Sequence, residues 1–290
     1  MIRLALLFLV AAAVAQAADP LRVVTLSTVL TEIAATVGGP DVAVTGLVRP
    51  GVDPHEFEPA PADLRPLARA DLVLASGLGL ESYLDRLSAH VAPRARFASA
   101  GAALSGTMLY TPGTGRPEPD PHWWNSVAAA IRVTRWTEAE FIALRPAAAP
   151  ALTRRADAYV GKLAALDQWA RGEVARIPPA RRQLVTTHDA FGWFARDYGF
   201  RISFISGISP DAEPSARDFA ALIDRIRRER IPAIFVENSA NPRLVDVLCR
   251  ETGAVLGGSL YADGLSAEGD GATYPGMVRH NVSVIVAALR

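Results

Sequence analysis

The chain has 290 residues, of which 50% are hydrophobic and 21% are charged, so one or two globular domains are expected. This composition excludes a disordered or collagen-like protein. The 30 basic residues balance the 30 acidic residues, and the formal net charge is zero. A neutral chain has no excess of Lys and Arg to attract a polyanion, so neither nucleic acid nor an anionic membrane surface is expected as its main partner.

The first 17 residues are typical of a secretory signal peptide. Arg3 is followed by the apolar run 4–14 and then by the small-residue sequence Ala15-Gln16-Ala17. This run is too short to span a bilayer, which takes about 20 residues. We therefore expect export, cleavage after Ala17 and a periplasmic location. No cysteine follows the segment closely, so we expect no lipid anchor.

Short β-type runs alternate with helical patterns in two sets, which is typical of βα units and parallel sheets. The first set contains β-type runs at 23–26, 43–48, 71–75 and 96–98, with helical patterns such as 64–70 and 80–91. The second set contains β-type runs at 183–187, 201–205, 233–236 and 254–256, with helical patterns at 215–229 and 242–252. We predict an α/β fold with two βα lobes, at 18–145 and 179–290.

One long amphipathic helix is predicted between the lobes, within 146–178. Its apolar residues recur at spacings of three and four, at Leu152, Ala156, Tyr159, Leu163, Leu166 and Ala170. Pro150 suits a first helical turn, and Pro178-Pro179 prevents continuation. About 27 residues at roughly 1.5 Å each give a rod of about 40 Å. We expect a rigid helix that joins the lobes; the alternative is an ordinary long helix inside one larger domain.

Cys249 is the only cysteine. It excludes an internal disulfide and a thiolate-rich metal site. Because it lies in a half-apolar helical pattern, we expect a buried, unreactive thiol.

Three of the five histidines stand where metal ligands are expected. His55 and His122 each end an Asp-Pro-His sequence, which favours a turn, and His188 follows a β-type run. Ligand sites of open α/β sheets lie at the carboxyl ends of strands, and imidazoles suit Zn²⁺. One such histidine is more simply a turn or surface residue, but three favour a metal site. His90 and His280 lie in helical patterns, and we expect both outside the site.

A carboxylate is the natural fourth ligand for such a site. Asp263 lies in an expected turn after a strand-like run. Spacing does not force this choice, because Glu56, Asp189 and Asp270 are also available.

Six motifs in order resemble the zinc/manganese solute-binding proteins of bacterial ABC importers. They are 51–59 (GVDPHEFEP), 120–122 (DPH), 187–191 (THDAF), 207–215 (GISP through EPS), 235–237 (FVE), and Thr273-Tyr274 followed by Asn281. The resemblance covers about 22–289. It implies two βα lobes joined by a single long helix, with the metal site in the cleft between the lobes.

The resemblance also implies the ligands and the function. The ligands are His55 and His122 from the first lobe, with His188 and Asp263 from the second. The chain resembles the periplasmic component that captures a metal ion and delivers it to an inner-membrane ABC permease, whose ATPase is a separate polypeptide. We expect a monomer.

The position of His188 bears on the choice of metal. Manganese-preferring members of this family tend to have a carboxylate there, and zinc-preferring members a histidine. Three imidazoles also suit Zn²⁺ better than Mn²⁺, which prefers oxygen donors. We expect Zn²⁺, with Mn²⁺ as the alternative.

The chain departs from the family pattern in two places near His122. Segment 110–119 has no histidine, whereas many zinc members carry a His-rich loop there, so no auxiliary metal site is expected. The sequence Trp123-Trp124-Asn125-Ser126 replaces the usual Trp-Leu-Asp-Pro. This replacement leaves open how the chain behind His122 is arranged.

Two enzyme classes are the competing interpretations. A zinc hydrolase is possible because Glu56 and Asp189 adjoin expected ligands, but a His-Glu-x-x-His motif is absent, and Asp263 would close the coordination position that a catalytic water needs. A nucleotide enzyme is disfavoured because no P-loop motif occurs and Gly77-Leu78-Gly79 lacks a third glycine at the required spacing.

Overall fold

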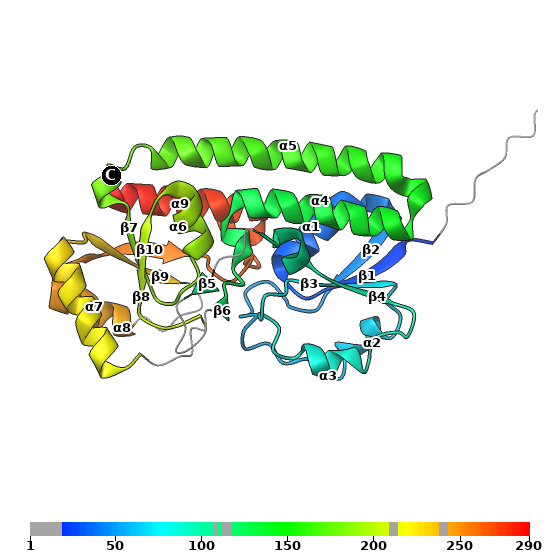
Figure 1. Cartoon of the computed structure of the whole chain (residues 1–290), viewed down its shortest axis with the longest axis horizontal. Helices are drawn as coiled ribbons and strands as arrows, with labels where there is room; N and C mark the ends of the chain where they lie inside the picture. The colour runs from blue at the N-terminus through cyan, green and yellow to red at the C-terminus, as the bar shows by residue number, and fades with distance from the viewer. Residues whose placement is uncertain (1–18, 107–109, 112–117, 209–213, 238–242) are drawn as a thin grey trace, which may run out of the picture.

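The computed structural model describes residues 19–106, 110–111, 118–208, 214–237 and 243–290. The fold is α/β, with two βα lobes bridged along one side by the long helix α5 (Ala149–Val174) (Figure 1). The expected signal peptide, 1–17, lies outside the described residues. Within the described ranges, no helix is both long enough and apolar enough to cross a membrane.

The first lobe is built on a parallel sheet of four strands in the order β2-β1-β3-β4. Its strands are β1 (Leu21–Thr25), β2 (Val42–Gly46), β3 (Leu72–Ala75) and β4 (Arg96–Ser99). Every residue of β3 is buried, as expected where helices cover both faces of a parallel sheet. Helix α1 (Thr28–Gly38) packs on one face, and the short helices α2 (Leu64–Leu67) and α3 (Leu84–Ser88) pack on the other.

The second lobe contains two parallel strand pairs that lie side by side. Strand β7 (Gln183–Thr186) pairs with β8 (Arg201–Phe204), β9 (Ala233–Glu237) pairs with β10 (Val255–Leu260), and β9 lies beside β7. The helices of this lobe are α6 (Gly192–Tyr198), α7 (Ala216–Glu229), α8 (Arg243–Thr252) and α9 (Tyr274–Leu289). The predicted β-type runs of both lobes are thus strands, and the helical patterns in the second lobe are helices of nearly the predicted length.

Helix α5 has 26 residues, and all six of its predicted apolar positions are buried. It does not run alone, because α4 (Val127–Leu144) and α9 pack along it (Figure 1). Helix α4 was not predicted from the sequence, since buried polar residues such as Thr134 and Thr137 interrupt its apolar pattern. Three packed helices therefore stiffen the connection between the lobes.

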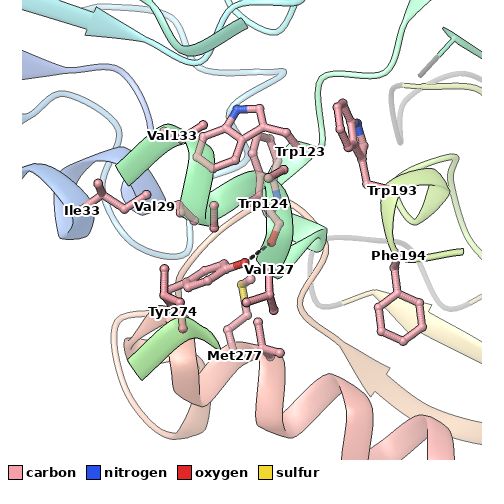
Figure 2. Close-up of a cluster of buried hydrophobic side chains, with 14 of the residues drawn as sticks. Val29, Ile33, Trp123, Trp124, Val127, Val133, Trp193, Phe194, Tyr274 and Met277 are labelled. Atoms are coloured by element: carbon pink, nitrogen blue, oxygen red, sulfur yellow. Dashed lines mark hydrogen bonds between the residues drawn. The ribbon is translucent and has the colours of Figure 1, made fainter. Parts of the chain in front are cut away.

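A single hydrophobic core includes residues of both lobes. Figure 2 shows Trp124 and Val127 beside Tyr274 and Met277 of α9, with Val29 of α1 close by. The Tyr274 hydroxyl donates to the main-chain carbonyl of Trp124 at 2.8 Å. Apolar burial across this region holds the lobes together directly, in addition to α5.

Cys249 lies on α8 at the edge of a separate core within the second lobe. It is only partly buried, so the expectation of a buried thiol is wrong. The half-apolar pattern places Val245 and Leu248 inward and leaves the thiol at the rim.

Two minor strands, β5 (Tyr110–Thr111) and β6 (Glu118–Pro119), form an antiparallel pair just before His122. Residues 112–117 between them, and 209–213 of the fourth motif, lie outside the described residues.

Candidate metal centre

The three histidines predicted as ligands come together between the lobes. His55 lies in the loop after β2, His122 immediately precedes a short 3₁₀ helix (Trp123–Asn125), and His188 follows β7. The ring centroid of His122 lies 5.1 Å from that of His55 and 5.2 Å from that of His188. Asp263, shortly after β10, completes the group. These four residues each offer one ligand atom, and all four atoms lie within 4.8 Å of one another.

The spacing of these atoms matches the size of one metal ion. His55 Nε2 lies 3.0 Å from His122 Nε2, and Asp263 Oδ1 lies 3.1 Å from His188 Nε2. Asp263 Oδ1 is also 3.7 Å from His55 Nε2 and 3.8 Å from His122 Nε2. A tetrahedral zinc site with arms of about 2.0–2.1 Å has edges of roughly 3.3 Å. The observed separations fall on both sides of that value.

Buried carboxylates orient two of the imidazoles. His122 Nδ1–H donates to Asp120 Oδ1 at 2.9 Å, and His188 Nδ1–H donates to Glu237 Oε2. Both carboxylates also accept the main-chain N–H of the histidine that they orient, from His122 at 2.9 Å and from His188 at 3.2 Å. With Nδ1 occupied, each ring presents Nε2 to the centre of the group, as in carboxylate–histidine–metal arrangements.

The charges in this group are strongly coupled. Burial disfavours the imidazolium of His188, but Asp263 and Glu237 outweigh burial and raise the pKa of His188 well above its usual value. Burial likewise opposes ionisation of Asp263, but His188 dominates and holds the pKa of Asp263 well below its usual value. The imidazolium of His188 and the carboxylate of Asp263 therefore stabilise each other in the metal-free protein. A bound metal ion would supply the positive charge in place of the proton.

The other candidate carboxylates lie outside the group of four. Glu56 is exposed, and the side chain of Asp270 is 79% exposed and lies 3.6 Å from His280 Nδ1. Asp189 is buried, and burial raises its pKa to about 7. Of these four carboxylates, that of Asp263 is the one grouped with the three histidines.

His90 and His280 also lie away from the group, as expected. His90 is exposed in the turn after α3. His280 Nε2 lies 3.0 Å from the carbonyl oxygen of Ser259.

The unusual sequence after His122 connects the site to the second lobe. Trp124 Nε1–H donates to the Ala262 carbonyl at 2.6 Å, and the side chain of Asn125 donates to the carbonyl of Ala190 at 2.9 Å. Trp193 Nε1–H donates to the Asp120 carbonyl at 3.0 Å. This part of the chain therefore bonds to the segments that carry His188 and Asp263.

The sequence analysis did not assign the roles of Asp120 and Glu237. The role of Asp120 could have been predicted from the local sequence, since it stands two residues before His122 just as Asp53 stands two residues before His55. Asp53 Oδ1 likewise accepts the main-chain N–H of His55, at 2.8 Å. Glu237 had only a topological signal, because it ends β9 beside the end of β7. Its proximity to His188 depends on strand order.

Comparisons with known proteins find metal-binding proteins that are similar over most of the chain. A family model described as "ZnuA: Zinc-uptake complex component A periplasmic" matches residues 23–288. "Manganese-binding lipoprotein MntA" of Bacillus subtilis (strain 168) is 35% identical over 276 residues, covering 93% of this chain and 90% of its own. "Zinc-binding protein TroA" of Treponema pallidum (strain Nichols) is 35% identical over 257 residues, covering 86% of this chain and 82% of its own.

Solved structures share the fold over nearly the whole chain. The periplasmic zinc-binding protein TroA of Treponema pallidum has a TM-score of 0.86 at 33% identity and covers 94% of this chain and 99% of its own. A Cd-bound periplasmic metal-binding protein of Candidatus Liberibacter asiaticus has a TM-score of 0.84 at 26% identity, with coverage of 92% and 99%.

Proposed function

The chain belongs to the ZnuA family of metal-binding solute-binding proteins of ABC importers, and on that premise we propose that it captures Zn²⁺ through His55, His122, His188 and Asp263. Members of this family are substrate-binding components of transporters and not enzymes. The observation that carries the proposal is the convergence of four donor atoms within 4.8 Å.

The donor set favours zinc. Three imidazole nitrogens and one carboxylate oxygen match borderline Zn²⁺, whereas Mn²⁺ prefers oxygen ligands. The carboxylates of Asp120 and Glu237 hold two imidazoles with Nε2 facing the ion, which reduces the cost of ordering them when the metal binds.

Manganese is the second candidate, and a specific similarity favours it. The relative named as manganese-binding, MntA, is as similar in sequence as the relative named as zinc-binding, TroA. The ligand at position 188 distinguishes the two candidates.

The rest of the proposal concerns the cell. We propose a periplasmic protein with a cleavable, unlipidated signal peptide at 1–17, although several relatives are named as lipoproteins. Its partners in this proposal are an inner-membrane ABC permease and a separate ATPase subunit, and it acts as a monomer. The proposed lobes extend over 18–145 and 179–290, joined by 146–178, and the ion lies in the cleft between them.

Metal content and competition test the proposal. The protein is purified from the periplasm without chelators, and its metals are counted; we expect one Zn²⁺ per chain. Anaerobic titration with both metals and a competing chelator then gives the zinc-to-manganese affinity ratio. Tighter Mn²⁺ than Zn²⁺ binding would overturn the zinc assignment, and a stoichiometry well above one would contradict the single site.

A further inference from the structure

The segment that carries Asp263 belongs to the second lobe in sequence but is bonded to the first. Leu265 N–H donates to Thr28 Oγ1 on α1 at 2.9 Å, and the Leu265 carbonyl accepts from Gly51 N–H at 2.8 Å. On the other side of Asp263, the carbonyl of Ala262 accepts from Trp124 Nε1. Both flanks of the carboxylate are therefore held by first-lobe groups.

The hydrogen-bond partners of the main chain change from the second lobe to the first between Tyr261 and Ala262. The main-chain N–H of Tyr261 donates to Asn281 Oδ1 at 2.9 Å, and its carbonyl accepts from Asn281 Nδ2 at 2.8 Å. Asn281 lies on α9, in the same lobe as Tyr261. The main chain thus bonds within its own lobe at Tyr261 and across the lobe boundary at Ala262 and Leu265.

Gly264 makes the contact with Thr28 possible. Its φ of +151° lies in a region that other residues rarely adopt, and a Cβ there would meet Thr28 Oγ1 at 2.5 Å. The hydroxyl of Thr28 thus occupies the space beside Gly264 and accepts the N–H of Leu265, two residues after Asp263. The small size of Gly264 and the hydroxyl of Thr28 together define the path of the main chain after Asp263.

We propose that Thr28 is a positioning residue for Asp263: through the N–H of Leu265 it fixes the main chain that presents the carboxylate to the ion. This inference rests on the proposed function, since it gives a role to a residue that does not touch the metal. Thr28 is buried, so removal of its hydroxyl leaves the N–H of Leu265 without this acceptor. Asp263 is then oriented by the first lobe.

Matched variants test the role of Thr28. Thr28→Val keeps the shape of the side chain and removes the acceptor, Thr28→Ser keeps the acceptor, and Thr31→Val removes a hydroxyl of the same helix that bonds only within the first lobe, to Thr25 and Ser27. Zinc affinity is measured against a competing chelator, and the visible absorption of bound Co²⁺ reports the ligand geometry.

We expect Thr28→Val to weaken zinc about tenfold and to shift the Co²⁺ bands, as loss of an outer-shell partner does elsewhere. Thr28→Ser and Thr31→Val should match the wild type in both measurements. Gly264→Ala disturbs the same loop from its other side and should weaken zinc as well, which keeps the test decisive if Thr28→Val does not fold.

Wild-type affinity and an unchanged Co²⁺ spectrum in Thr28→Val, or in Gly264→Ala where that variant replaces it, would overturn this inference alone. A wild-type chain that binds no metal would overturn the proposed function, and this inference with it.

Discussion

His122 and His188 are the same residue type in nearly the same setting, but their pKa values are shifted in opposite directions. Both are fully buried, and both donate Nδ1–H to a carboxylate. At His122, burial outweighs the attraction of Asp120 and lowers the pKa. At His188, Asp263 and Glu237 together outweigh burial and raise it. The difference lies in how closely the carboxylates approach: His122 is bonded to Asp120, with Asp263 Oδ1 3.8 Å from its Nε2, whereas His188 is bonded to Glu237 and has Asp263 Oδ1 3.1 Å from its Nε2. The closer pair favours the protonated ring at His188.

Removal of either imidazole should have the largest effect. His122→Ala and His188→Ala each delete a ligand of the proposed site, and we expect zinc affinity to fall at least about 100-fold, or about 2.7 kcal/mol. The comparison predicts a further difference. His188→Ala alone leaves Asp263 and Glu237 without their cation, so it should lower the metal-free melting temperature more than His122→Ala.

Chelator competition and thermal unfolding check this pair. His90→Ala and His280→Ala are the controls and should leave zinc affinity unchanged, since neither side chain is in the group of four. A tenfold loss in either control would show that the ligand assignment is wrong.

Replacement of the orienting carboxylates should cost less. We expect Asp120→Asn and Glu237→Gln to weaken zinc about 10- to 100-fold, because each leaves the ring in place but disturbs its orientation and basicity. Only Glu237→Gln should also lower the pKa of His188, which NMR titration of the metal-free protein can follow. Equal effects of the two variants on the pKa of His188 would show that Glu237 is not the carboxylate that raises it.

Exchange of the ligand type at position 188 should change selectivity rather than abolish binding. His188→Glu offers a harder oxygen donor, so the zinc-to-manganese affinity ratio should fall by about tenfold, or about 1.4 kcal/mol. Calorimetry with each metal and a competing chelator gives the ratio. An unchanged ratio would mean that this position does not determine metal choice.

The pKa shifts of His188 and Asp263 predict how the stability of the metal-free protein depends on pH, a smaller effect than the loss of a ligand. The pKa of His188 is raised by folding, so its protonated form stabilises the metal-free fold fully below about pH 6.5, and this contribution is lost as pH rises through the folded-state pKa. Asp263 has a depressed pKa, and its contribution is present above about pH 3.9 and lost as pH falls through its own folded-state pKa.

Zinc must therefore displace a proton at His188 but not at His122. We expect release of about one proton per zinc at pH 7, which calorimetry in buffers of different ionisation enthalpy measures. As pH is lowered, zinc affinity should begin to decrease before pH 6.5 is reached. His188→Ala should release close to none. Binding without proton release in the wild type would show that both histidines are neutral.

The smallest expected effect is on overall shape. Helix α5 extends along both lobes, with α4 packed on it beside the first lobe and α9 beside the second, and a continuous helix has no loop to absorb a large hinge rotation. Scattering profiles of the metal-free and zinc-bound protein should therefore nearly coincide. A change of several ångströms in radius of gyration would overturn this expectation.

Periodicity and local motifs were sufficient for most of the architecture. The strands of both lobes and the buried face of α5 follow from apolar spacing, because burial on one face imposes a period that is visible in the residues themselves. His55, His122 and His188 could be recognised because each stands in a turn or directly after a strand. Helix α4 could not be predicted from apolar spacing because part of its buried face is polar.

What the sequence could not determine depends on contacts between distant segments. Asp263 could not be chosen over Glu56, Asp189 or Asp270 by spacing, since the choice depends on a loop that is bonded to the opposite lobe. Glu237 lies beside His188 only because β9 packs next to β7. The opposite pKa shifts of His122 and His188 arise for the same reason: they depend on how closely the folded chain brings carboxylates to each buried ring, which no local pattern contains.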